Sequence, residues 1–168
     1  MINSLVKIIT VDGFFNLKEA KNLSQIVFDL QYEEKEYGEE IVNFNMVPEN
    51  ANQMFSDILN TNIVVDKERS GIFRRPKNFI HFESFDGLND WVFVCALQQS
   101  TFNVFEHQLG SVNALQDYKF NYRNLFEWDL KINYILSPGQ GILFRPWLFH
   151  SFDKGLIQLF RLKENGTQ

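Results

Sequence analysis

Three side chains that could bind one divalent metal ion stand at two distant places in the sequence. His81 and Glu83 are separated by a single residue in the run IHFE. Residues i and i+2 of a strand point to the same face, so this imidazole and this carboxylate would project side by side. His150, in a later aromatic-rich run, is the candidate for a third ligand. Two imidazoles and one carboxylate form a facial set with open coordination positions, which suits non-haem Fe(II) with an oxidant and a chelating co-substrate.

A charged residue follows this set in sequence. Arg161 lies eleven residues after His150, inside the apolar run Leu156 to Leu162. Burying an unpaired guanidinium is costly, so the sequence predicts that Arg161 meets an anion or a carboxylate. At strand period, Ile157 and Leu159 share the face of Arg161.

The remaining histidine and the single cysteine have less specific patterns. His107 follows a strand-like run and could line the same site, replace one of its ligands, or be a hydrogen-bonded residue at a strand end. Cys95 excludes an internal disulfide framework and indicates a buried structural thiol in a reducing compartment. Arg145, just before Pro146, is expected to pair with a carboxylate.

The elements that must position these residues follow from hydrophobic period and turn signals. Asn16 and Glu19 have the spacing of a capping box, which predicts a helix over 17–30, and a second helix is predicted over Glu49–Asn60. Strands are predicted over Leu5–Val11, Ile41–Val47, Asn62–Val65, Asn78–Glu83, Trp91–Leu97, Phe102–His107, Trp128–Leu136, Ile142–Phe144, Trp147–Phe152 and Leu156–Leu162. Two helices followed by about eight strands indicate an α+β chain with a sandwich or jelly-roll barrel as its body.

Composition bounds the class of protein. The 168 residues predict one domain over 1–168, and a hydrophobic content of 45% with 18 phenylalanines can fill its core. A net charge of −5 without a basic cluster argues against a nucleic-acid partner. The sequence shows neither a signal peptide nor an apolar stretch long enough to span a membrane, so a cytoplasmic location without membrane association is expected.

The motif order resembles that of the 2-oxoglutarate/Fe(II)-dependent oxygenases: His-x-acid, a long gap, a second His, then an Arg. The opening strand, the Asp12-Gly13 turn and the first helix look like those of small prolyl-4-hydroxylase-like members found in bacteria and phages. The resemblance therefore leaves open that the chain is encoded by a phage. The resemblance implies a double-stranded β-helix, a jelly-roll or cupin-like barrel with the two N-terminal helices packed outside. It also implies Fe(II) on His81, Glu83 and His150.

The same resemblance implies a function. Arg161 would pair with the distal carboxylate of 2-oxoglutarate, since a guanidinium fork grips a carboxylate at two points. The chain would be a dioxygenase that hydroxylates an amino-acid or peptidyl, prolyl-like substrate. Small-molecule or peptide substrates are thus the expected partners, and exposed aromatic residues within 101–128 leave room for a homodimer.

The sequence departs from the family pattern at three places, so more than one function stays open. Glu83 stands where Asp is usual, and Lys163 stands where a Ser or Thr commonly follows the Arg. Gly155 and Arg161 also lie further apart than in many relatives. A catalytically silent relative would keep the barrel alone. A non-catalytic jelly-roll module, phage structural or carbohydrate-binding, would also fit, as would a cupin-type metalloenzyme that does not use 2-oxoglutarate.

Overall fold

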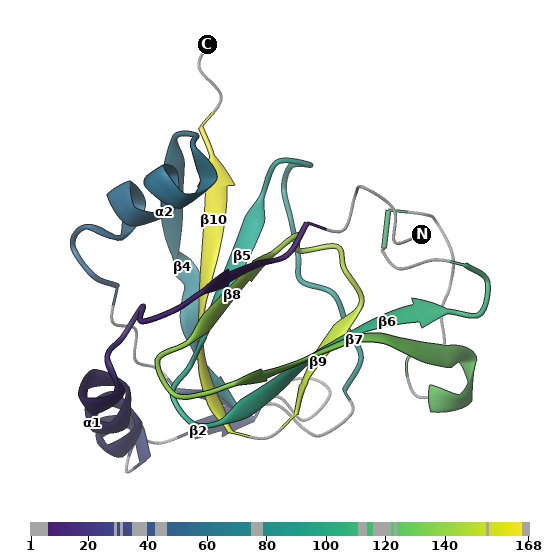
Figure 1. Ribbon diagram of the computed structural model, residues 1–168, viewed down its shortest axis with the longest axis horizontal. Helices are drawn as coiled ribbons and strands as arrows, with labels where there is room; N and C mark the ends of the chain where they lie inside the picture. Colours follow the sequence, from purple (N-terminus) through teal and green to yellow (C-terminus); the bar gives the residue numbers. More distant parts are fainter. Residues whose placement is uncertain are drawn as a thin grey trace.

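Two antiparallel sheets form the body of the protein. The computed structural model describes residues 7–28, 30, 32–34, 40–42, 47–74, 79–110, 114–115, 122, 124–153 and 155–165. Figure 1 shows the arrangement of the elements, which are β1 (Ile9–Val11), α1 (Leu17–Phe28), β2 (Tyr32–Glu34), β3 (Glu40–Val42), α2 (Ala51–Leu59), β4 (Ile63–Arg74), β5 (Trp91–Ala96), β6 (Ser100–His107), the short 3₁₀ helix η2 (Leu125–Glu127), β7 (Trp128–Leu136), β8 (Gly141–Phe144), β9 (His150–Asp153) and β10 (Leu156–Glu164).

The chain passes back and forth between the two sheets. The larger sheet has the strand order β1-β8-β5-β10-β4-β3-β2, and the smaller one has the order β7-β6-β9. From β5 onward the chain enters the small sheet for β6 and β7, returns for β8, leaves again for β9 and ends in the large sheet with β10. The predicted α+β class is therefore confirmed, and the architecture is consistent with a jelly-roll-like fold.

The first helix begins with the predicted capping box. The Glu19 amide donates to Asn16 Oδ1 over 2.9 Å, and the Asn16 amide donates to Glu19 Oε2 over 2.8 Å. Both bonds satisfy backbone donors that the first helical turn leaves without an intrahelical acceptor. The boundary at Leu17 was thus predictable from the sequence.

Both helices cover the outer face of the large sheet. Their apolar residues join one cluster with side chains of β4, β5 and β10, and Figure 1 shows α1 and α2 on the side away from β6 and β7. The helical members of this cluster are Ala20, Leu23, Val27, Ala51 and Phe55.

A second apolar cluster fills the space between the sheets. Strand β10 divides its side chains between the two clusters, with Ile157 and Leu159 in the space between the sheets and Phe160 and Leu162 against the helices. This alternation confirms the predicted shared face of Ile157 and Leu159 and places Arg161 on the same side of the strand by its period. The inner cluster also includes Val92, Val94, Phe102, Val104, Ile142, Phe144 and Phe152.

Several strand predictions differ from the structure. The strand predicted over Trp147–Phe152 begins only at His150, because the residues before it form a turn in which the Leu148 amide donates to the Arg145 carbonyl. Strand β4 runs on to Arg74, well beyond the predicted end at Val65, because its polar middle shows no alternation and its pairing with β10 shifts register there. Within the described part of the predicted strand Asn78–Glu83, only His81 makes a sheet bridge. Leu5, the predicted start of the first strand, lies outside the described residues.

No helix in the described ranges is long and apolar enough to cross a membrane. The extent of one domain over 1–168 stays a prediction.

Candidate metal centre

The predicted ligand atoms meet at one point. One ligand atom from each of His81, Glu83 and His150 lies within 4.8 Å of the others, and within the described residues this is the one such group of His, Cys, Asp and Glu. The distance from His81 Nε2 to Glu83 Oε1 is 3.1 Å, and from His150 Nε2 to the same oxygen it is 3.5 Å. The sequence-predicted residues are therefore brought together by the fold.

Backbone pairing sets this convergence. The amide of His81 donates to the carbonyl of His150 over 2.9 Å, and the amide of His150 donates back to the carbonyl of His81 over 2.9 Å. The amide of Glu83 then donates to the carbonyl of Pro146 over 2.7 Å. Segment 81–83 is held beside the approach to β9 by these bonds although it forms no regular strand.

Hydrogen bonds to both imidazole rings determine which nitrogen faces the site. His81 Nδ1 is 3.0 Å from the carbonyl oxygen of Phe79, and His150 Nδ1 is 2.8 Å from that of Leu148. A carbonyl oxygen only accepts, so each Nδ1 carries a proton, and a neutral imidazole in this orientation can offer the lone pair of its Nε2 to a cation. Two such lone pairs and one carboxylate oxygen that face each other fit a divalent cation, and carbonyl bonds at Nδ1 are the usual outer partners of metal-binding histidines.

Aromatic rings surround the two imidazoles. His150 is fully buried, with its ring centroid 4.7 Å from Phe144, 5.5 Å from Phe152 and 5.7 Å from Phe102. Phe79 stacks on His81 with centroids 5.0 Å apart. Charges in such an apolar surround are screened less than in water, so the polar atoms of the site interact strongly.

Arg161 meets the carboxylate that its burial requires. Its Nη2 contacts Glu83 Oε2, and its Nη1 donates to the carbonyl of Ser84 over 2.8 Å. Its Nε is buried and has no hydrogen-bond partner among the described residues. The predicted carboxylate partner of Arg161 is therefore confirmed and is Glu83, while a role towards 2-oxoglutarate stays a prediction.

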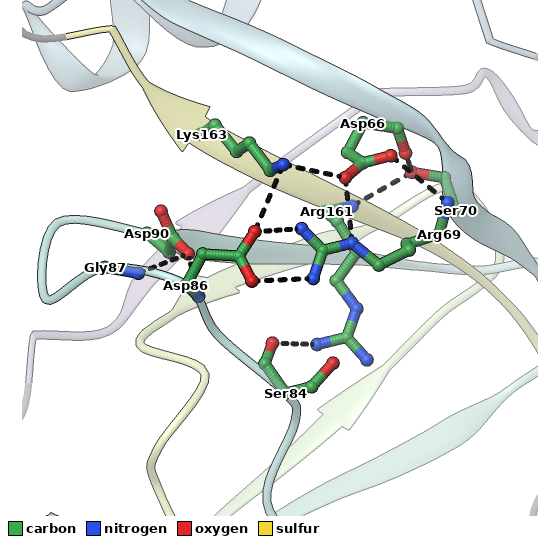
Figure 2. A network of polar contacts seen from close by, with 9 residues as sticks. All are labelled: Asp66, Arg69, Ser70, Ser84, Asp86, Gly87, Asp90, Arg161 and Lys163. Carbon is green, nitrogen blue, oxygen red and sulfur yellow. Dashed lines mark hydrogen bonds and ion pairs between the residues drawn. The ribbon is translucent and has the colours of Figure 1, made fainter.

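A network of four charges ties the segment after Glu83 to the large sheet. Arg69 contacts both carboxylate oxygens of Asp86 and donates from Nε to Asp66 over 2.8 Å. Lys163 Nζ lies 3.1 Å from Asp86 and 3.2 Å from Asp66. Figure 2 shows these four residues together, while the guanidinium of Arg161 points away from them toward Ser84.

These contacts stabilise the ionised form of Asp86. Hydrogen bonds from Arg69 and then Lys163 lower the pKa of Asp86 from 3.8 to about 2. Sequence reasoning missed this network, because Asp86 lies in a loop and nothing in the sequence relates it to Arg69. The network anchors the loop immediately after the candidate ligand Glu83.

The other singled-out residues lie apart from the centre. His107 ends β6, where its Nε2 is 3.3 Å from Glu127 Oε2 and its ring meets the edge of Trp128 at 4.9 Å between centroids. Of the three roles considered for His107, this position matches the hydrogen-bonded residue at a strand end. Cys95 is fully buried, as predicted, and burial raises its thiol pKa to about 12.

The prediction for Arg145 was wrong. Its guanidinium lies 3.7 Å from the ring centroid of Trp91, and its Nη1 donates to the backbone carbonyl of Asp90 over 3.0 Å. A ring face and a carbonyl therefore take the place of the expected carboxylate.

The chain is thus an α+β protein of two antiparallel sheets with a His-Glu-His cluster beside the smaller sheet. No family model matches the chain, and no curated protein matches it by sequence. Solved structures match the chain by their fold. One is HygX from Streptomyces hygroscopicus with nickel, 2-oxoglutarate and hygromycin B bound. It aligns with a TM-score of 0.62 and 10% sequence identity, over 96% of this chain and 84% of HygX.

Two further structures of HygX also match the fold of this chain. With nickel and 2-oxoglutarate bound the TM-score is 0.58 at 11% identity, over 96% of this chain and 84% of HygX. The apo form has a TM-score of 0.51 at 11% identity, over 96% of this chain and 83% of HygX. At these identities the likeness shows a shared fold.

Proposed function

We propose that this chain is an Fe(II)- and 2-oxoglutarate-dependent dioxygenase built on a double-stranded β-helix. The observation that carries the proposal is the convergence of two imidazole nitrogens and one carboxylate oxygen, from His81, His150 and Glu83, within 4.8 Å. The alternation of β5 to β10 between two sheets supports the double-stranded β-helix. The HygX structures support the co-substrate, because that protein has the same fold and was solved with nickel and 2-oxoglutarate.

Each ligand has a distinct part in holding the metal. His81 Nε2, His150 Nε2 and Glu83 Oε1 would bind Fe(II), and the carbonyls of Phe79 and Leu148 keep both imidazoles in the required tautomer. When bound, iron and 2-oxoglutarate supply the oxidation: one oxygen atom of O₂ enters a C–H bond as hydroxyl, and the other enters succinate as the keto acid loses CO₂. The phenylalanines around His150 exclude water from this side of the centre.

Arg161 is the proposed partner of the co-substrate. Its Nε is a buried donor without a partner among the described residues, and buried donors in proteins are nearly always satisfied. A carboxylate of 2-oxoglutarate would satisfy it and would gain a charge-assisted bond. Ile157 and Leu159, which lie on the same side of β10, would wall the methylene carbons of the keto acid.

The proposed substrate is an amino acid or a prolyl-like peptide, from the resemblance to prolyl-4-hydroxylase-like proteins. HygX was solved with hygromycin B bound, so the substrate panel for this fold also includes hygromycin B. A cytoplasmic location and a small-molecule or peptide partner remain part of the proposal.

Thermal unfolding separates the proposed function from its rivals. Mn(II) at one hundred times its Kd adds ~2.7 kcal/mol by mass action, a Tm rise of about 5–10 °C for a chain of this size. The Tm of a dioxygenase should rise with Mn(II) and should rise further when 2-oxoglutarate is added together with Mn(II). A cupin-type metalloenzyme should respond to metal alone, and a non-catalytic jelly-roll module to neither.

Turnover provides the second test. Fe(II), 2-oxoglutarate and O₂ should yield succinate, at a higher rate with an accepted substrate. Succinate production that stays at the level of a His81→Ala, His150→Ala double variant would refute catalysis even if metal binds, and would leave a silent relative.

A further inference from the structure

The two oxygens of Glu83 face different partners. Oε1 lies 3.1 Å from His81 Nε2 and 3.5 Å from His150 Nε2, whereas Oε2 contacts Nη2 of Arg161. We infer that Arg161 is a positioning residue for the metal-binding carboxylate, and that it is needed for metal affinity in the absence of any keto acid. This inference rests on the proposed function, because it takes the His-Glu-His cluster as the metal site.

A buried glutamate needs such a partner. The Glu83 side chain has three rotatable bonds, and only 4% of the residue is exposed. The guanidinium at Oε2 adds a restraint on the last torsion of this side chain, and its loss would leave Oε1 held less firmly toward the imidazoles. A guanidinium that fixes Oε2 therefore fixes Oε1 in the position from which it can bind a metal together with two Nε2 atoms.

Arg161 is itself held in place. Its backbone amide donates to Ser70 Oγ over 3.0 Å, and its Nη1 donates to the carbonyl of Ser84, the residue after Glu83. The guanidinium thus spans the side chain of the ligand and the backbone that follows it. A group anchored from β4 and from the loop can restrain the carboxylate at a small additional cost in entropy.

This role differs in its consequences from a role in binding 2-oxoglutarate. A residue that binds only the keto acid changes the affinity for that acid and leaves the affinity for metal alone unchanged. A residue that positions Glu83 changes the affinity for metal alone. The two roles can coexist, because Nη1 and Nη2 serve Ser84 and Glu83 while Nε remains for the keto acid.

The test is calorimetric titration of the full chain with Mn(II) and no 2-oxoglutarate. Arg161→Met should weaken Mn(II) binding by at least about tenfold, as loss of an outer partner of a metal ligand does. Arg161→Lys should recover most of this loss, because it keeps a cationic donor. Lys131→Met is the control: it removes one positive charge from β7, where Nζ contacts Glu106 and Asp129 instead of Glu83 or the loop after it. It should change the affinity by less than about twofold.

A shorter ligand provides an independent readout. Glu83→Asp shortens the ligand by one methylene and should separate its carboxylate from Arg161, so in that background Arg161→Met should weaken Mn(II) binding by less than about twofold. If Arg161→Met fails to fold, Arg161→Gln takes its place in both backgrounds. Unchanged or tighter Mn(II) binding by the Arg161 variants, through relief of repulsion between cations, overturns the inference while leaving the metal site intact. Failure of the wild-type chain to bind Mn(II) overturns the proposed function as well.

Discussion

The backbones of His81 and His150 exchange two hydrogen bonds of 2.9 Å, one in each direction. Because of this single bridge, two histidines far apart in the chain present Nε2 to the same carboxylate oxygen of Glu83. The geometry of the proposed metal centre therefore depends on one local pairing between segment 81–83 and the start of β9.

Removal of one imidazole should abolish the metal response. His81→Ala deletes a ligand but keeps the backbone bonds to His150, so the variant should fold, and its Tm should no longer rise with Mn(II). His107→Gln is the matched control, because this histidine pairs with Glu127 away from the cluster. The variant should keep the full Tm rise, and loss of the response in both would contradict the assignment of the site.

The charge network around Asp86 should give a pH-dependent stability. The pKa of Asp86 is lower in the folded protein, about 2, than its ordinary value of 3.8, because Arg69 and Lys163 donate to its ionised form. Its contribution to folding is therefore complete above about pH 4 and is lost as the pH falls toward 2. The difference in unfolding free energy between wild type and Asp86→Asn should shrink over that window.

Urea unfolding at several pH values measures this difference. Asp129→Asn is the control, since its carboxylate is exposed and its ion pair with Lys131 is 3.8 Å long. A wild-type advantage over Asp86→Asn that is the same at pH 5 and near pH 2 would contradict the role of the network.

The thiol of Cys95 should be inert in the native protein. Burial raises its pKa from 9.0 to about 12, which lowers the thiolate fraction at neutral pH about a thousandfold, in addition to the steric protection of a fully buried atom. A chromogenic disulfide reagent should report one thiol per chain in denaturant and almost none in buffer. Full labelling in buffer within minutes would show that β5 opens readily.

Two glycines with positive φ should differ in their tolerance of alanine. At Gly110, φ +82°, a Cβ would meet no described atom within 4 Å, whereas a Cβ on Gly139, φ +91°, would lie 2.2 Å from the carbonyl oxygen of Phe15. Gly110→Ala should cost only the strain of a left-handed residue, ~1–2 kcal/mol. Gly139→Ala must also displace the backbone near Phe15 and should cost more than ~3 kcal/mol by urea unfolding. Equal costs would contradict the close approach.

Local rules predicted much of this fold from the sequence. The capping box of Asn16 and Glu19 and the alternation in β10 each depend on neighbours within a few residues. The pairing of His-x-Glu with a distant histidine was also predictable, because few residue types can form such a centre and the chain has only three histidines.

Other features depend on tertiary partners that no local pattern reveals. The full length of β4 was not predicted, because the charged residues in its middle suggest a loop. In the folded protein these charges are paired, Arg69 with Asp86 and Asp66 with Lys163. The guanidinium of Arg145 contacts the ring face of Trp91 and the backbone carbonyl of Asp90, where a carboxylate was expected. The sequence predicted that Arg161 meets an anion or a carboxylate, but it did not identify Glu83 as this partner. The pairing depends on how the loop after Glu83 folds against β10.

A crystal structure of the protein soaked with Mn(II), with the ion located by its anomalous scattering, tests the proposed metal centre. One strong peak is expected within coordination distance of His81 Nε2, Glu83 Oε1 and His150 Nε2. At saturating Mn(II), the absence of a peak among these three atoms, or a peak bound by other residues, would contradict the proposed centre.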